Sequence, residues 1–248
     1  MKLLATLLAA AALAGCSGLN PFGPDRPTPK PLEPIAAPIT AAQVWKDSVG
    51  AVEVPMVVAV NGGVVTLASS DGNVVALEDA SGRSLWRANV GAKLSAGVGS
   101  DGKIAAVVTR GGELVALEAG QVKWKKAIGA RVATAPLVAG GRIFVLGVDR
   151  GVQAFDAEDG AKLWQVQRPG DPLTLAQEGV IAAFKDTLVV GQGPRMAGIE
   201  PLSSTIRWEV PVGSPRGANE VERLADLVGP ALRTGDLLCA RSFQAVSY

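Results

Sequence analysis

The stretch "GNVVALEDASGRSLWRANVG", residues 72–91, sets the plan for most of this chain. Two later stretches nearly repeat it, "GELVALEAGQVKWKKAIG" at 112–129 and "GVQAFDAEDGAKLWQVQRPG" at 151–170. Each contains a glycine, an apolar run that ends in an acidic residue, a polar turn and a tryptophan. Self-similarity at a fixed period is typical of repeat architectures, so the sequence predicts a repeat protein.

Each repeat divides into four short apolar runs separated by turn signals. In the first unit we expect strands at 57–60, 64–69, 73–78 and 84–90, with "NGG", "SDG" and "DASG" between them. Glycine in such turns supplies the positive φ that tight hairpins require. The fourth unit is weaker, because "PLSSTI" occupies its last turn without a glycine.

The tryptophans mark the period of the repeat. They are spaced 41, 38, 40 and 44 residues apart, at Trp45, Trp86, Trp124, Trp164 and Trp208. A four-stranded antiparallel unit of about 40 residues is one blade of a β-propeller, so we predict an all-β propeller in which each indole docks on the neighbouring blade. A ligand-binding aromatic cage is disfavoured, because one tryptophan per blade at one register cannot converge on a single pocket.

The sequence of residues 1–16 is typical of a bacterial lipoprotein. Residues 1–15 have an early lysine and a short run of Leu and Ala, which is typical of a secretory signal peptide and too short for a membrane span. Leu13-Ala14-Gly15-Cys16 matches a bacterial lipobox, so we expect Cys16 to be acylated and to anchor the chain in lipid. A plain secretory signal followed by an accidental cysteine is the alternative.

A proline-rich stretch follows the expected lipidation site. Residues 19–40 contain seven prolines and no periodic apolar pattern. Proline removes hydrogen-bond donors and fixes φ, so this stretch is unsuited to a sheet. We interpret 16–41 as the lipidated cysteine and a tether, and 42–248 as the propeller; a proline-rich arm packed on the domain is the alternative.

Composition disfavours catalysis and nucleic-acid binding. The chain has no histidine, which removes the commonest general base, the Ser-His-Asp and Cys-His catalytic arrangements, and histidine-bound zinc or haem. Its 24 basic and 23 acidic residues are interspersed, so no basic patch for nucleic acid is predicted. Lipidation of Cys16 would leave Cys239 without a disulfide partner. We therefore expect no enzyme activity, catalytic residue, metal or cofactor.

The repeat pattern resembles the tryptophan-docking repeat of pyrroloquinoline-quinone dehydrogenases and their non-catalytic relatives. With the lipobox, the proline-rich tether, "VWKDSVG" at 44–50 and "GSPRGANEVERLADL" at 213–227, the chain resembles the BamB family of outer-membrane β-barrel assembly lipoproteins. The resemblance implies an eight-bladed, non-catalytic scaffold on the periplasmic side of the outer membrane. It further implies binding to a POTRA domain of BamA within the Bam complex, and help with folding and insertion of unfolded outer-membrane barrel proteins. A quinone-dependent dehydrogenase is the alternative, although its calcium ligands, cysteine pair and haem motif are not visible.

Two longer connections are the candidate partner-binding loops, "RPGDPLTLAQEG" at 168–179 and "GSPRGANEVERLAD" at 213–226. In an up-and-down blade both emerge on one face, so we expect them side by side. Asn219 precedes Glu222 by three residues, which favours a short helix with a capping box. The resemblance assigns partner binding to Leu173, Leu175, Glu222, Arg223 and Asp226, although Ala176 stands where the family often has arginine. The alternative is that both loops are ordinary solvated linkers.

The chain length differs from the family pattern. Counting from Val57 gives four blades and a fifth that begins with "DLVGPAL", "DLLCARS" and "FQAVSY". Eight blades of about 40 residues need about 320 residues, so we expect a C-terminally truncated propeller that forms an open arc. Closure at five blades, with 43–49 as an orphan fourth strand, is the alternative; a packed interior would resist the change in blade angle.

Overall fold

The computed structural model describes residues 41–53, 55–170, 173, 175, 177–243 and 245–247. The expected signal peptide, Cys16 and nearly all of the expected tether lie outside these residues. The described part consists of strands and loops, and it contains no helix that could cross a membrane. One compact unit runs from Gln43 to Tyr248.

The strands form five antiparallel sheets, which we call blades 1 to 5 in chain order. Blade 1 contains β1 (Ala59–Asn61), β2 (Val64–Ala68), β3 (Asn73–Glu78) and β4 (Ser84–Asn89). Blade 2 contains β5 (Gly99–Ser100), β6 (Ile104–Val108), β7 (Glu113–Glu118) and β8 (Gln121–Ala127). Blade 3 contains β9 (Leu137–Ala139), β10 (Arg142–Leu146), β11 (Gly151–Asp156) and β12 (Lys162–Gln167). Blade 4 contains β13 (Val180–Phe184), β14 (Thr187–Gln192), β15 (Arg195–Ile199) and β16 (Ile206–Pro211), and blade 5 contains β17 (Leu232–Thr234), β18 (Leu237–Ser242) and β19 (Ala245–Ser247).

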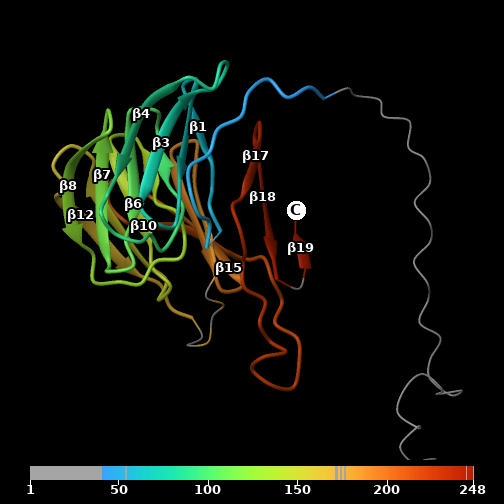
Figure 1. The fold of residues 1–248 in the computed structure, drawn as a ribbon. Helices are drawn as coiled ribbons and strands as arrows, with labels where there is room; N and C mark the ends of the chain where they lie inside the picture. The colour runs from blue at the N-terminus through green and yellow to red at the C-terminus, as the bar shows by residue number, and fades with distance from the viewer. Residues whose placement is uncertain are drawn as a thin grey trace, which may run out of the picture. The chain divides into compact units, whose positions relative to one another are not determined.

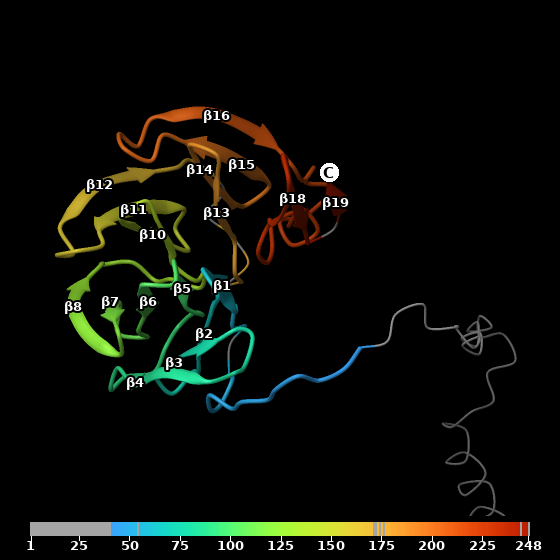
Figure 2. The same cartoon turned by 90° about the horizontal axis from the view of Figure 1, so that it is seen from above.

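The blades of the compact unit follow one another around an arc (Figures 1 and 2). In the view from above, β1, β5 and β13 lie toward the middle, whereas β4, β8, β12 and β16 lie at the periphery (Figure 2). The inner strands of consecutive blades contact each other, as β1 does β5, β5 does β9 and β9 does β13. The predicted all-β propeller arc of four-stranded blades is therefore confirmed.

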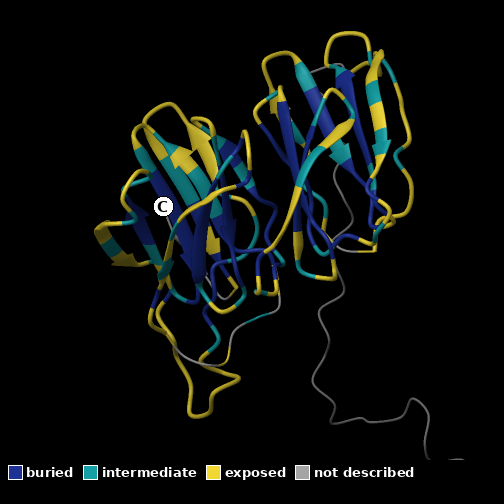
Figure 3. Cartoon of the chain, turned by 90° about the vertical axis from the view of Figure 1, so that its left-hand side faces the viewer, coloured by how far each residue is buried: buried dark blue, intermediate teal, exposed yellow. Residues whose placement is uncertain are grey.

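The hydrophobic core lies between neighbouring blades. All five residues of β6 are buried, because Ile104, Ala106 and Val108 pack toward blade 3 while Ala105 and Val107 pack toward blade 1. A middle strand with both faces covered needs a continuous apolar run instead of an alternating one. Figure 3 shows the result, with the two middle strands of the blades largely buried and the loops and outer strands largely exposed.

The alanine of the repeat pattern makes room for the tryptophan of the same blade. The third and fourth strands pair a small residue with each indole-bearing residue: Ala76 with Trp86, Ala116 with Trp124, Ala154 with Trp164, and Gly198 with Trp208. The strand register shifts directly after each of these small residues. Such a bulge re-aims side chains and increases local twist. The repeat thus places a small residue and a bulge beside every indole.

Three indoles are hydrogen-bonded to the following blade. Each indole N–H donates to a backbone carbonyl in the turn between the third and fourth strands of that blade. The pairs are Trp45 with Asp79 (2.7 Å), Trp124 with Ala157 (3.0 Å) and Trp164 with Pro201 (2.9 Å). Trp86 packs in the core between blades 1 and 2. Trp208 on β16 is 37% exposed.

The expected strand at 43–49 does not form. Residues 41–50 have no strand pairing, and the segment is held on blade 1 by side chains instead: Trp45 docks on the turn at Gly82, and Arg87 binds the carboxylate of Asp47 and the carbonyl of Ser48. No described residue of this segment pairs with blade 5, whose described strands are β17, β18 and β19. A strand needs a hydrogen-bonded neighbour, and without one the segment stays irregular. Closure at five blades through this segment does not occur.

Glycine suits the turn that receives an indole for two reasons: the backbone there is left-handed, and the indole leaves no space for a Cβ. At Gly160, φ is +71°, and an added Cβ would lie 2.7 Å from Cδ2 of Trp124. In blade 4 the corresponding residue is Ser204, which has a φ of 64°. A left-handed conformation costs a residue with a side chain about 1–2 kcal/mol. At this position blade 4 therefore carries backbone strain that glycine avoids in blade 3.

A pair of reciprocal substitutions tests this explanation. We expect Gly160→Ser to lower the free energy of unfolding by about 2 kcal/mol or more, because it adds backbone strain and a clash with Trp124. We expect Ser204→Gly to raise it by about 1 kcal/mol. Urea unfolding followed by tryptophan fluorescence measures both. Equal and small effects of the two substitutions would contradict the explanation.

Candidate partner-binding face

One end of the blades carries two sets of loops, which we call the linker face. It consists of the linkers between blades (90–98, 128–136, 168–179 and 212–231) and the loops between the second and third strands (69–72, 109–112, 147–150 and 193–194). The two sets are hydrogen-bonded to each other: Arg110 N–H donates to Lys93 O, and Val148 N–H donates to Arg131 O, both at 2.8 Å. Both loops predicted to bind a partner belong to this face.

Asp226 joins the two predicted loops. Its side-chain Oδ2 accepts the N–H of Leu175, 51 positions earlier in the chain. Its own carbonyl accepts the N–H of Phe243 at 2.8 Å, and the residue is only 5% exposed. The expectation that the loops lie side by side therefore agrees with the geometry. Asp226 positions them from beneath the surface.

The loop at 213–226 contains one hydrogen-bonded turn where a short helix was expected. Asn219 Oδ1 accepts the N–H of Glu222 (2.9 Å), and the Glu222 carboxylate accepts the N–H of Ala218 (2.8 Å). These two contacts resemble a capping box, but the turn covers only residues 220–223. The prediction of a helix was wrong: residues 220–223 are exposed, and the apolar residues that follow, Ala225 and Leu227, are buried from an irregular segment. A single helical turn without packing is only marginally stable in water. Figure 1 shows this loop, in orange, extending beyond the end of the sheets.

The surface of the two loops combines apolar and charged side chains. Leu173 is 43% exposed, Leu175 is half-buried, and Val221 is 69% exposed. Glu222 and Arg223 are also exposed. Exposed apolar residues ringed by charges are a common composition of protein interfaces. Ala176, the predicted departure from the family pattern, lies outside the described residues.

Arg168 at the start of the first loop is buried, which the sequence analysis missed. Its side chain is 1% exposed; Nη2 lies 3.0 Å from Glu209 Oε1, while Nε and Nη1 have no hydrogen-bond partner. Burial lowers the pKa of the Arg168 guanidinium, and the adjacent Glu209 carboxylate opposes that effect. A comparison of the blades could have revealed this burial. The fourth residue after the tryptophan is aliphatic in three blades (Val90, Ile128 and Val212), and Arg168 occupies the same position in blade 3.

This buried ion pair predicts an asymmetric mutational response. Removing one partner of a buried pair costs about 3–5 kcal/mol, whereas replacing the pair with apolar residues is often neutral. We therefore expect Glu209→Ala to lower the free energy of unfolding by about 3 kcal/mol. The double variant Arg168→Val, Glu209→Ala should recover most of the loss. Urea unfolding provides the measurement, and a double variant less stable than Glu209→Ala alone would contradict the interpretation.

Glu178 lies on the inner side of the blades. It lines a cavity of about 400 Å³ together with residues from all five blades, among them Asn61, Ser100, Thr134 and Arg233. Burial raises the pKa of the Glu178 carboxyl, and a hydrogen bond from Ala135 N–H partly offsets the effect. The Glu178 carbonyl accepts the N–H of Gly229 (2.8 Å), which connects blade 4 to the linker before β17. A buried acid at this place stabilises the fold best when it is neutral.

The raised pKa of Glu178 predicts a pH-dependent contribution to stability. Since the folded pKa lies above the ordinary value of 4.5, the contribution is complete below about pH 4.5 and is lost as the pH rises through the folded pKa. Glu178→Gln should therefore be more stable than the parent chain at pH 7, and the difference should vanish near pH 4. Urea unfolding between pH 4 and 8 measures this. Glu220→Gln makes the same chemical change at an exposed residue and is the control for the substitution itself.

The described residues offer no cluster of three or more His, Cys, Asp or Glu side chains that could hold a metal ion.

These observations define a class of protein: a propeller built of tryptophan-docked blades, with two joined loops on one face. Residues 70–248 match the family described as "Outer membrane protein assembly factor BamB". The chain belongs to this family.

Two relatives agree with this assignment, and a solved structure shares the fold. The chain is 36% identical over 236 residues to the outer membrane protein assembly factor BamB of Bordetella pertussis, covering 94% of this chain and 61% of the relative. It is 31% identical over 248 residues to that of Burkholderia pseudomallei, covering 97% of this chain and 64% of the relative. The crystal structure of BamB from Moraxella catarrhalis has a TM-score of 0.68 at 22% identity, covering 80% of this chain and 61% of that one.

More distant structures share the fold alone. A quinohemoprotein alcohol dehydrogenase from Comamonas testosteroni has a TM-score of 0.52 at 16% identity, covering 77% of this chain and 39% of the other. Its similarity extends to the propeller architecture that the dehydrogenases and the assembly factors have in common.

Proposed function

We propose that this protein is a non-enzymatic scaffold for outer-membrane protein assembly. In this proposal the chain is anchored in the outer membrane by acylated Cys16, faces the periplasm and assists the folding and insertion of barrel proteins. Family membership supports the assembly role, since the relatives are named as assembly factors. The chain spans 61% and 64% of the two relatives' lengths, so their activity as whole proteins is carried over here as part of the proposal.

The partner surface in this proposal is the pair of loops joined by Asp226. Leu173, Leu175, Glu222 and Arg223 would contact a POTRA domain of BamA, and Asp226 would hold the two loops in the register that such a contact needs. The hydrogen bond between Leu175 and Asp226 carries the proposal, because it makes one surface from two loops that are far apart in sequence. Preorganised loops lose less entropy on binding than free ones do.

Co-purification with the periplasmic region of BamA tests the surface. We expect Leu173→Asp to weaken binding about tenfold or more, because it places a charge in the apolar part of the contact. Leu202→Asp is the matched control: Leu202 is 64% exposed in the turn between β15 and β16, at the opposite end of the blades. Unchanged binding by the Leu173 variant would mean that the surface is misplaced.

Asp226 requires two variants, because its proposed role is to position the loops. Asp226→Ala removes the acceptor of a Leu175 N–H that the protein partly buries, which should cost about 1–3 kcal/mol and weaken binding. Asp226→Asn retains a side-chain carbonyl and should therefore keep much of the stability and much of the binding. Weak binding by a fully stable Asp226→Asn variant would instead indicate direct contact by the carboxylate.

A quinone-dependent dehydrogenase remains the alternative function on grounds of fold. Absorbance of the purified chain after addition of pyrroloquinoline quinone and calcium discriminates between the two. A bound chromophore with alcohol-dependent reduction would replace the scaffold proposal, and the scaffold proposal expects neither.

A further inference from the structure

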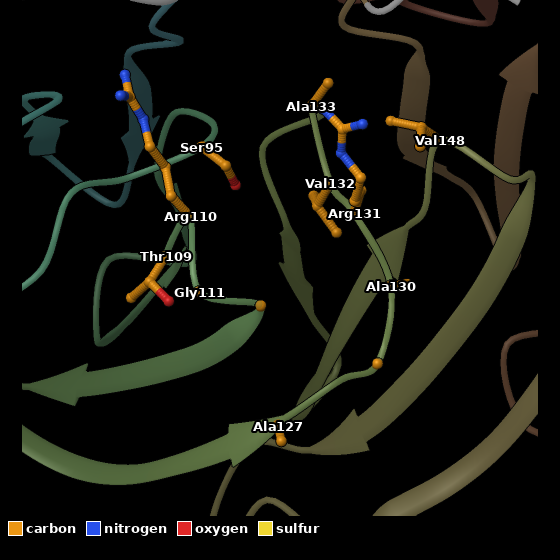
Figure 4. Close-up of a pocket in the computed structure, with 12 residues that line it drawn as sticks. Ser95, Thr109, Arg110, Gly111, Ala127, Ala130, Arg131, Val132, Ala133 and Val148 are labelled. Carbon is orange, nitrogen blue, oxygen red and sulfur yellow. The ribbon is translucent and has the colours of Figure 1, made fainter.

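A groove opens on the linker face between blades 2 and 3, away from the two long loops. Its volume is about 680 Å³, within the range of roughly 300–1,000 Å³ that is usual for ligand sites. Its walls come from the loop 109–112 of blade 2 and from the linker 127–133 (Figure 4). Glycine and alanine make up much of this lining, so the backbone is accessible there.

The groove exists because blade 2 departs from the repeat at two positions. Where blade 2 has Gly111, blades 1 and 3 have Asp71 and Asp149; where it has Ala127, they have Asn89 and Gln167. In blades 1 and 3 these polar side chains fill the loop: Ser69 donates to Asp71, and Gln167 donates to Asp149 O. Blade 2 has lost both the acid and the amide. At these two positions the groove therefore has smaller side chains and one carboxylate fewer than blades 1 and 3 have.

The amide lost from blade 2 also served as an acceptor. In blade 1, Asn89 Oδ1 accepts the N–H of Gly91 at 2.8 Å. In blade 2 the corresponding pair is Ala127 and Gly129, and a methyl group cannot accept a hydrogen bond. The N–H of Gly129, which lines the groove, therefore lacks the acceptor that its counterpart has.

Two guanidinium groups flank the groove. Arg110 and Arg131 extend from opposite walls with their charged ends at the same side (Figure 4). Arg110 is paired with Glu53 at 2.8 Å. Arg131 is exposed, and none of the residues that the structure describes forms an ion pair with it. One wall of the groove thus presents an exposed guanidinium group.

The junction between blades 1 and 2 shows what a cation at the repeat position of Arg131 binds, although this junction keeps Asp71 and Asn89 and has a second cation, Arg110, where the groove has Val148. There the irregular segment before β1 crosses from blade 1 toward blade 2, and Glu53 places its carboxylate on Lys93 (3.3 Å) and Arg110 (2.8 Å). The same segment is held through its backbone, because Glu53 N–H donates to Ser70 Oγ (2.7 Å) and Ala51 O accepts from Ser70 N–H (2.8 Å). Lys93 occupies the repeat position of Arg131. The chain therefore docks an acidic segment of its own one junction away.

We propose that the groove between blades 2 and 3 binds an acidic, extended peptide segment of a partner protein. A carboxylate of that segment pairs with Arg131, as Glu53 pairs with Lys93, and the backbone of the segment lies along the Gly111–Gly112 and Gly129–Ala130 lining. This site is separate from the loops of the proposed function. Arg131 supplies the charge, and Gly111 and Ala127 supply the room.

Fluorescence anisotropy on the purified full chain tests the site with a labelled octapeptide of alternating Glu and Ala. We expect Arg131→Ala to raise the Kd by roughly fivefold, the upper range for a solvent-exposed ion pair. Gly111→Asp should raise it further, since it restores the acid of blades 1 and 3 and places it among the ligand's carboxylates. This substitution is compatible with the fold, because Gly111 does not have positive φ and an added Cβ would meet only Thr109 Oγ1, at 3.6 Å.

Controls separate this site from general charge effects and from the proposed function. Arg83→Ala removes an exposed arginine from a turn at the opposite end of blade 1 and should leave the Kd unchanged. Leu173→Asp should also leave it unchanged, even if it abolishes co-purification with BamA. Equal binding of a peptide of alternating Gln and Ala, or no effect of Arg131→Ala, would overturn the proposal. So would binding of phosphatidylglycerol vesicles through Arg131 in preference to the peptide, which would make the ligand a lipid surface.

Discussion

The structure depends on the docking of one indole per blade on the turn of the next blade. A single sheet of four short strands cannot bury both of its faces, so it is stable only when another sheet covers each face. Trp45, Trp124 and Trp164 secure that packing with both an apolar surface and a hydrogen bond to a backbone carbonyl of the next blade. Aromatic residues suit this role because they bury 150–250 Å² each while keeping a polar group at the edge. Trp45 shows that the contact does not require a strand, because it docks from an irregular segment.

Much of the fold could be predicted from the sequence, because the repeat encodes it locally. The strands of blade 1 lie within one or two residues of their expected positions, and the turns have the glycines that their backbone requires. The strand expected at 43–49 and the helix expected after Asn219 were wrong for a shared reason. Both segments have suitable local patterns, but neither has the neighbouring surface that would stabilise the element. Local propensity is a weak guide where tertiary contacts are missing.

The candidate site was less predictable than the fold. Loop length indicated which segments project from the face, and the resemblance suggested which residues to consider. Neither indicated that Asp226 is buried and bound to the backbone of Leu175, because that contact joins segments 51 residues apart. The buried Arg168 could have been found by comparing blades, since the other three carry an aliphatic residue at its position. Glu178 gave no comparable signal, and its altered pKa arises from burial by several blades together.

The blades of a repeat protein can be compared with one another position by position. A position at which one blade differs from the others then indicates what that residue does. Where all blades agree, the residue type serves the shared fold, as the small residue (alanine or glycine) paired with the tryptophan of blades 1 to 4 does. Where one blade differs and the fold is unchanged, the difference acts on the surface or on a neighbouring loop. Arg168 replaces an aliphatic residue at the loop joined to Asp226, and Gly111 with Ala127 opens the groove beside Arg131. Both departures lie on the linker face. At the opposite end the docking turns also differ between blades, as Ser204 and the two-residue turn at 119–120 show, but each of these turns still packs against an indole. Departures there act on the contact between blades, whereas those on the linker face act on an exposed surface.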